Sequence, residues 1–210
     1  MQSKLLLLAA LAAAAQSETW RFDNLQKIGG HAVKVQGHPK VIETPKGKAV
    51  EFNGVDDALF LDVHPLAGTT AFTWEVIFRP DRGGNPEQRF FHLQENGSET
   101  RMLFETRLIG DRFCLDAFVR SDTGQQALMD RTKLHPLGEW YNAAAVYDGK
   151  EFRSYLNGVL ELKADLKLTP QKAGRTSVGV RINLRDYFKG AVRQARMTKR
   201  ALQPAQFLKP

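Results

Sequence analysis

The sequence is poor in cysteine. Cys114 is the only cysteine among 210 residues, so no disulfide can form within the chain. A fold without cross-links must be stabilised by the burial of its hydrophobic core. Cys114 itself stands in an apolar run, where a small buried thiol is the expected role, because a nucleophile would need a neighbouring base.

Long hydrophobic runs are also absent beyond the N-terminus. The one apolar run covers residues 5–15, and its eleven residues fall short of the ~20 that span a bilayer. It follows Lys4 and ends in a small-residue site at residues 15–17, which is the order of a secretory signal peptide. We therefore predict a signal peptide over residues 1–17, a mature domain over residues 18–210 without a membrane span, and a secreted or periplasmic location.

No strong excess of one charge is present. Lys and Arg number 30 against 23 Asp and Glu, which gives a formal net charge of +7. The densest basic stretch, residues 181–200, is interleaved with acceptors and apolar residues, as on a solvated strand face. We predict no nucleic-acid partner, and an acidic polysaccharide or an anionic envelope surface stays open as a partner.

Sustained helical periodicity is missing, and short alternating segments separated by turn residues take its place. Residues 72–78 place four large apolar side chains on one side of a strand. Residues 138–161 contain three strand-like runs joined by Asp148-Gly149 and Asn157-Gly158, which predicts a three-stranded meander. Roughly a dozen such strands, with turns every ~8 to 12 residues, predict an all-β sandwich of two antiparallel sheets.

Four short motifs follow one another along the chain. They are AVEFNGVDD at residues 49–57, FTWEVIFRP at residues 72–80, the meander at residues 138–161, and FKGAV with RAL within residues 188–202. Together they resemble the laminin-G-like, concanavalin A-like lectin/glucanase superfamily, and in particular its bacterial jelly-roll modules. The resemblance covers nearly the whole mature chain and implies a concanavalin A-like jelly-roll β-sandwich.

The resemblance does not extend to a metal site. The acidic pair that is usual in the superfamily after the closing Val or Ile is Arg193-Gln194 here. Carboxylates in such loops matter in relatives that hold calcium, so we predict no cofactor. Asp56 and Asp57 have two interpretations, as turn residues or as ligands of a structural calcium ion. The histidines show no zinc-binding spacing.

A catalytic constellation is not recognisable either. The superfamily's glucanases use a tight E-x-D-x-x-E or E-x-D-x-E array for the two carboxyl groups of sugar hydrolysis. This chain has no such array, although strand pairing could bring Glu75 and Asp116 together. Residues 187–194 resemble the Y-F-K-A-G-x-Y-x-Q strand of jelly-roll alginate lyases, but Arg193 stands at the second, catalytic tyrosine. We predict no catalytic residues, with a polysaccharide lyase or glycoside hydrolase acting on acidic glycans as the alternative.

The strand faces that point away from the core are left for binding. Carboxylates and guanidinium groups hydrogen-bond sugar hydroxyls, and an aromatic ring packs on the C–H side of a sugar. We predict one ligand-binding surface made by polar and aromatic side chains of neighbouring strands: Glu75, Arg107, Asp116, Arg120, Arg153 and Tyr155. The alternative is that these charged side chains form solvent-exposed ion pairs across strands and bind no ligand.

The sequence therefore predicts an exported, non-catalytic, lectin-like module. Its ligand would be a carbohydrate or another extracellular or envelope component. An envelope adhesion module that recognises protein is the alternative outside the carbohydrate-binding class.

The signal-peptide prediction can be checked directly. In a bacterium with an intact secretion pathway, the exported protein should begin at Glu18, because cleavage removes the apolar run. N-terminal sequencing and intact mass of the periplasmic fraction measure this. A full-length chain retained in the cytoplasm would contradict the prediction.

Overall fold

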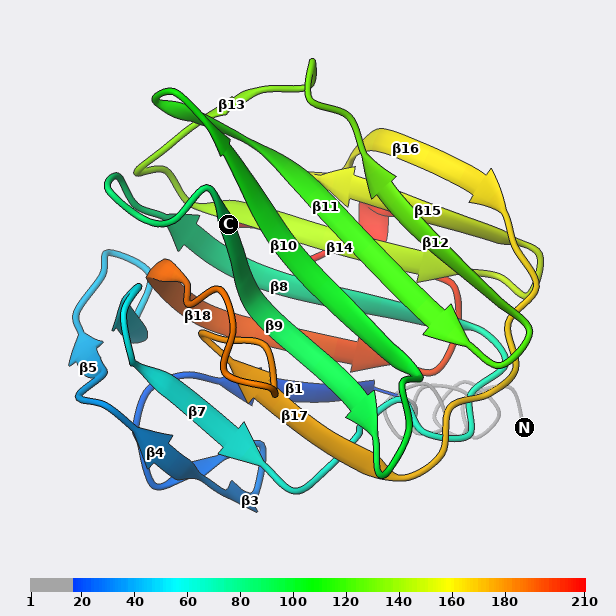
Figure 1. Ribbon diagram of the computed structural model, residues 1–210, viewed down its shortest axis with the longest axis horizontal. Helices are drawn as coiled ribbons and strands as arrows, with labels where there is room; N and C mark the ends of the chain where they lie inside the picture. Colours follow the sequence, from blue (N-terminus) through cyan, green and yellow to red (C-terminus); the bar gives the residue numbers. More distant parts are fainter. Residues whose placement is uncertain (1–16) are drawn as a thin grey trace, which may run out of the picture.

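The computed structural model describes residues 17–210. They form eighteen β-strands and one short 3₁₀ turn (Figure 1). The predicted signal peptide lies outside the described residues except for Ser17, which begins β1 (Ser17–Arg21), so both the peptide and the boundary at residue 18 stay predictions. Among the described residues, no helix has the length and hydropathy needed to cross a bilayer.

Two antiparallel sheets are layered on each other, and we call them the front sheet and the back sheet by their depth in Figure 1. The back sheet has the spatial order β16 (Val159–Asp165), β15 (Glu151–Leu156), β14 (Tyr141–Tyr147), β8 (Phe72–Pro80), β18 (Lys189–Thr198), β6 (Ala49–Asn53) and β5 (Lys40–Ile42). β1 also pairs with β18.

The front sheet makes the other layer. Its spatial order is β12 (Gly124–Met129), β11 (Arg112–Ser121), β10 (Arg101–Ile109), β9 (Glu87–Glu95), β17 (Gly174–Val178), β7 (Ala58–Leu61) and β4 (Lys34–Gln36). β13 (His135–Pro136) pairs with β11, and β2 (Lys27–Ile28) with β3 (His31–Ala32) forms a separate small sheet. The predicted all-β sandwich of two antiparallel sheets is confirmed.

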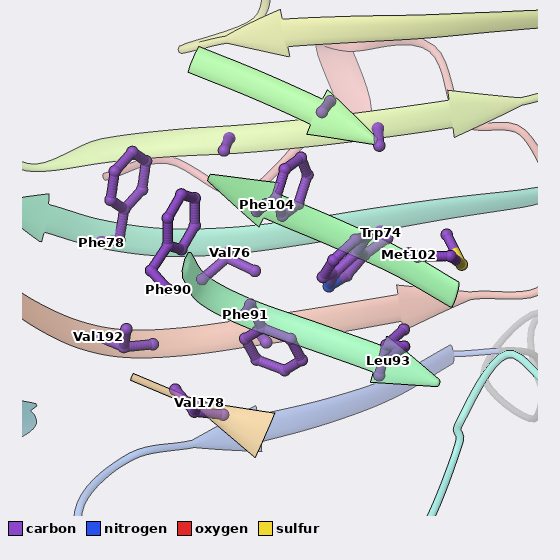
Figure 2. Packing of buried hydrophobic residues seen from close by; sticks show 14 of the residues in the cluster. Trp74, Val76, Phe78, Phe90, Phe91, Leu93, Met102, Phe104, Val178 and Val192 are labelled. Carbon is purple, nitrogen blue, oxygen red and sulfur yellow. The ribbon is translucent and has the colours of Figure 1, made fainter. Parts of the chain in front are cut away.

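The core is an aromatic layer between the sheets (Figure 2). Phe78 of the back sheet stacks on Phe90 of the front sheet with ring centroids 4.1 Å apart. Trp74 stacks on Phe104 at the same distance, and Phe90 and Phe104 lie 5.6 Å apart within the front sheet. Because successive residues of a strand point to opposite faces, these inward rings leave every second position of each strand facing outward.

β9 departs from strict alternation. Its pairing with β10 shifts register between Phe104 and Glu105, which marks a β-bulge. Both Phe90 and Phe91 are fully buried in the core as a result. In a regular strand, Arg89 and Phe91 would point to the same face because they are two residues apart. The bulge between them changes the direction of the side chains beyond it, so Phe91 points into the core and Arg89 points outward.

The meander predicted for residues 138–161 is confirmed as β14, β15 and β16. Asn157 and Gly158 turn with φ of 52° and 82°, the left-handed conformation that this dipeptide favours. β17 ends at Val178. Gly179 has φ of +87°, and a Cβ there would lie 2.4 Å from the Phe52 ring, so the chain must turn at a glycine.

The C-terminal segment covers part of the outer face of the back sheet. Around the 3₁₀ turn Pro204–Gln206, Leu202 and Phe207 pack against Ala144 and Tyr155. The rings of Tyr155 and Phe207 meet edge to face, with centroids 5.2 Å apart. This part of the back sheet is therefore a second, small hydrophobic core.

Phe90 gives a stability prediction, because it touches rings in both sheets. Phe90→Ala should lower the free energy of unfolding by about 3–5 kcal/mol, as for other large-to-small changes in a packed core. Denaturant titration measures this. Val159→Ala, at a side chain that is 67% exposed, is the control and should change stability by less than about 0.5 kcal/mol. A loss below about 1 kcal/mol for Phe90→Ala would contradict the role of the stack.

Candidate functional site

The structure divides the six predicted ligand-binding residues between two faces. Three point outward from the front sheet: Arg107, Asp116 and Arg120. Three point outward from the back sheet: Glu75, Arg153 and Tyr155. The prediction of one shared surface is therefore wrong. The meeting of Glu75 with Asp116 is also excluded, because the aromatic core lies between their sheets.

Glu75 and Tyr155 lie under the C-terminal segment. The Glu75 side chain is fully buried and accepts hydrogen bonds from Arg196 Nε at 2.6 Å and from the Leu208 amide at 2.7 Å. Tyr155 is 6% exposed and packs on Phe207. These two side chains hold the C-terminal segment on the back sheet.

Arg153 is engaged close to the turn between β14 and β15. Its guanidinium pairs with Asp148, and its Nε lies 2.9 Å from Glu151 Oε1. Both partners are within five residues of Arg153 in the sequence. The ion pairs therefore support the hairpin locally.

Two tripeptides of the same pattern face each other in the front sheet. Glu87-Gln88-Arg89 on β9 and Glu105-Thr106-Arg107 on β10 run antiparallel, so Glu105 lies opposite Arg89 and Arg107 lies opposite Glu87. Arg89 Nε is 3.1 Å from Glu105 Oε1, and Arg107 pairs with Glu87. Each guanidinium thus faces the carboxylate of the neighbouring strand.

Two aspartates extend this pairing. Arg107 Nη2 donates to Glu105 Oε2 at 2.6 Å and to Asp116 Oδ2 at 2.7 Å. Arg89 pairs with Asp186, which comes from the loop after β17. We call the six residues of this network the charged cluster: Glu87, Arg89, Glu105, Arg107, Asp116 and Asp186. Four carboxylates share two guanidinium groups, so the side chains are cross-linked across three strands and a loop.

Burial and ion pairing act in opposite directions on the charged cluster. Burial raises the pKa of Glu105 and of Asp116 despite the guanidinium groups of Arg89 and Arg107. At Glu87, whose side chain is 48% exposed, burial also acts upward, but the same two guanidinium groups together outweigh it and lower the pKa. The buried carboxyls are therefore the proton-sensitive members of the cluster.

A basic and aromatic patch shares this outer face. The Arg101 guanidinium lies over the Phe118 ring, 4.9 Å from its centroid, and Arg120 lies opposite Arg101 across the strands. Burial and the positive charges of Arg181 and Arg120 lower the pKa of Arg101. We call these residues the arginine patch: Arg101, Phe118, Arg120 and Arg181. Arg101 pairs with Glu99 at 3.0 Å, whereas Arg120 and Arg181 have no ion-pair partner among residues 17–210. The patch therefore places two unpaired cations and an aromatic ring beside the charged cluster.

The six predicted ligand-binding residues do not include Glu87, Arg89, Glu105 or Asp186 of the charged cluster. The repeated E-x-R pattern could have found the first three, because antiparallel pairing sets each Glu opposite an Arg. Asp186 stands in a loop that reaches the sheet only through tertiary folding. No pattern in the sequence marks it.

Asp56 and Asp57 serve the turn after β6. Asp57 accepts hydrogen bonds from the His38 amide at 2.6 Å and from the Asn53 amide at 3.0 Å, and Asp56 accepts one from the Asn53 side chain at 2.7 Å. These contacts fit their interpretation as turn residues. Within the part of the chain that the structure describes, no group of three or more His, Cys, Asp or Glu side chains is arranged to hold a metal ion.

Comparison with protein families now identifies the fold. Residues 53–207 match the model of the concanavalin A-like lectin/glucanases superfamily. The chain belongs to this superfamily. The resemblance carried by the four sequence motifs is thereby confirmed. No curated protein sequence matches the chain significantly.

Solved structures share the concanavalin A-like fold at low identity. Domain 4 of an extracellular GH43 arabinanase from Geobacillus stearothermophilus, solved with arabinotriose, matches with a TM-score of 0.66 and 18% identity over 90% of this chain and 94% of that chain. The binding domain of Paraclostridial Mosquitocidal Protein 1 matches with a TM-score of 0.69 and 12% identity, over 91% of this chain and 51% of that chain. The receptor binding domain of botulinum neurotoxin D matches with a TM-score of 0.67 and 10% identity, over 90% of this chain and 50% of that chain. This superfamily member thus spans about half the length of the two toxin domains.

Glu75 gives a pH-dependent prediction. Burial raises the pKa of Glu75 above the ordinary value of 4.5. At a pH between the pKa of the unfolded state and that of the folded state, the folded protein therefore keeps a proton that the unfolded chain has lost. The stability that this proton adds is complete below pH 4.5 and is lost as the pH rises through the folded pKa. The free energy of unfolding of the wild type, minus that of Glu75→Gln, should therefore fall with rising pH in denaturant titrations.

The control for this prediction is Glu43→Gln, because the Glu43 side chain is 78% exposed. It should leave the pH dependence of the wild type unchanged. A difference between wild type and Glu75→Gln that stays flat or grows with pH would refute the assignment.

Proposed function

We propose that this protein is a non-catalytic carbohydrate-binding module whose ligand lies on the outer face of the front sheet. One observation carries the proposal: the charged cluster and the arginine patch occupy the same outward face. Arg107 and Asp116 hold each other in a fixed geometry there, and the Phe118 ring lies on a neighbouring outward position. Three of the residues predicted from sequence, Arg107, Asp116 and Arg120, belong to this face.

This combination of groups is suited to binding a sugar. Its hydroxyls pair with carboxylates and guanidinium forks, and its C–H side packs on an aromatic ring. Side chains that are already held by ion pairs lose little conformational entropy when a ligand binds. Arg107 is held in this way, with a side chain that is 15% exposed and contacts to three carboxylates.

The same geometry favours binding over hydrolysis. Glycoside hydrolysis needs one carboxyl group that donates a proton and a second that acts as nucleophile or base. Glu105 and Asp116 both accept hydrogen bonds from a single nitrogen of Arg107. Glu105 Oε2 and Asp116 Oδ2 are thus engaged with a cation inside the network, which suits a fixed recognition surface.

We further propose that the module acts outside the cytoplasm, secreted or in the periplasm. The sequence pattern of residues 1–17 supports this location. The arabinanase domain with the same fold belongs to an extracellular enzyme and was solved with arabinotriose, which supports a carbohydrate as the ligand class.

A glycan-array screen of the mature protein, followed by calorimetry on the best ligand, tests the proposal. Phe118→Ala and Arg120→Gln should each weaken binding about tenfold, ~1.4 kcal/mol, because each removes a ligand contact without breaking the charged cluster. Arg153→Gln is the matched control. It removes the same charge from the back sheet and should leave the affinity unchanged.

Product analysis after incubation with polymeric glycans separates binding from catalysis. Unsaturated or shortened products from acidic glycans would establish the lyase or hydrolase alternative and overturn the non-catalytic assignment. Binding to no glycan on the array would favour an adhesion module that recognises protein. Equal weakening by Arg153→Gln would remove the front sheet as the site.

A further inference from the structure

Two arginines lie over one tryptophan on the outer face of the back sheet, but their surroundings differ. Arg79 is 5.5 Å and Arg193 is 5.3 Å from the centroid of the Trp140 ring. Arg79 Nε is 2.8 Å from Asp81 Oδ1, and its Nη2 is 3.1 Å from Glu51 Oε1, so its charge is neutralised. Arg193 is only 8% exposed, and no carboxylate of the described residues pairs with it.

A β-bulge gives Arg193 its position. β18 pairs Val192 with Phe78 and Gln194 with Ile77, so Arg193 is an extra residue without a partner on β8. Its carbonyl accepts a hydrogen bond from an amide just after β1, which fixes the bulge. Bulges redirect a side chain and are frequent beside functional sites. Burial lowers the pKa of Arg193 with no carboxylate to oppose it, so a bound anion would relieve an unfavourable environment.

Arg193 forms part of the wall of a cavity of 210 Å³ between β1, β18 and the loop before β6. The charged residues of this wall are Arg21, Asp23, Lys46, Lys48 and Arg193. Lys46 donates to the Pro210 carbonyl, and Lys48 lies 3.7 Å from a carboxylate oxygen of Glu43. Arg21 and Arg193 have no ion-pair partner among residues 17–210, so positive charge dominates the cavity.

We propose that this cavity binds an anionic group of an acidic polysaccharide, a uronate carboxylate or a sulfate ester, with Arg193 as the central contact. A guanidinium presents a planar fork that matches such oxyanions with two hydrogen bonds. The cavity is smaller than the ~300 Å³ at which whole small-molecule pockets begin, so it suits one charged group on a longer chain.

The recessed position of Arg193 favours a polysaccharide over a membrane surface. Anionic lipid surfaces attract clusters of protruding Lys and Arg side chains. Arg193 instead is only 8% exposed and lines a cavity, which a substituent projecting from a polymer can enter. The cavity is on the back sheet, so this site does not depend on the front-sheet site proposed above.

The test measures binding of the mature protein to dextran sulfate, to polygalacturonate, to unmodified dextran and to vesicles of anionic phospholipid. Dextran is the matched ligand control, because it lacks only the sulfate groups. The wild type should bind at least one polyanion and not dextran. Arg193→Gln should weaken this binding about tenfold. Arg175→Gln removes an exposed charge from β17 of the front sheet and should leave the binding unchanged.

Trp140 provides a local signal for the same experiment. It is half-buried, whereas Trp20 and Trp74 are at most 1% exposed, so a change of tryptophan emission on binding reports on the surroundings of Arg193. Arg21→Gln changes an exposed residue of the cavity wall and keeps the test decisive should Arg193→Gln reduce folding. It should also weaken binding.

Three outcomes would overturn the proposal. The first is no binding to either polyanion at low salt. The second is equal weakening by Arg175→Gln, which would mean attraction by net charge alone. The third is binding only to vesicles of anionic phospholipid, which would assign the cavity to a membrane surface. Binding to dextran sulfate would identify the anionic group as a sulfate ester, and binding to polygalacturonate would identify it as a uronate carboxylate. Either result supports the proposal.

Discussion

The contact of aromatic rings between the two sheets is the interaction on which the rest of the structure depends. Without a disulfide, the front and back sheets are joined by burial of side chains such as Trp74, Phe78, Phe90 and Phe104. Since these rings occupy the inward positions of β8, β9 and β10, the outward positions of the same strands are free to carry charge. The polar faces are therefore a consequence of how the core is built.

The two outer faces use this freedom differently. On the back sheet, Leu202 and Phe207 cover the area around Tyr155, and Glu75 binds the backbone of the same segment. On the front sheet, the outward charges pair with one another across strands, which buries Glu105 and Asp116 and leaves Glu87 exposed. A surface whose polar groups are mutually fixed is suited to recognition, whereas a face closed by its own chain contributes to stability.

The sequence predicted the fold well, because hairpin dipeptides and period-two alternation are local signals. The meander from β14 to β16 follows from Asp148-Gly149, Asn157-Gly158 and the runs between them. The site was less predictable, since alternation tells whether a side chain points outward but not from which sheet. Glu75 and Asp116 both point outward, yet on opposite sides of the molecule. The bulges at Phe90 and at Arg193, and the covering of Tyr155, depend on tertiary contacts that no local pattern encodes.

The reciprocal E-x-R pairing also determines how β9 and β10 align. A slip of two residues would keep every apolar side chain on its own face, so the hydrophobic pattern alone does not forbid it. In one direction the slip would set Glu105 opposite Glu87, and in the other it would set Arg107 opposite Arg89. Like charges directly opposite each other are destabilising, so both misaligned pairings are disfavoured. The charged cluster thus also favours the observed alignment of β9 and β10 over both two-residue slips.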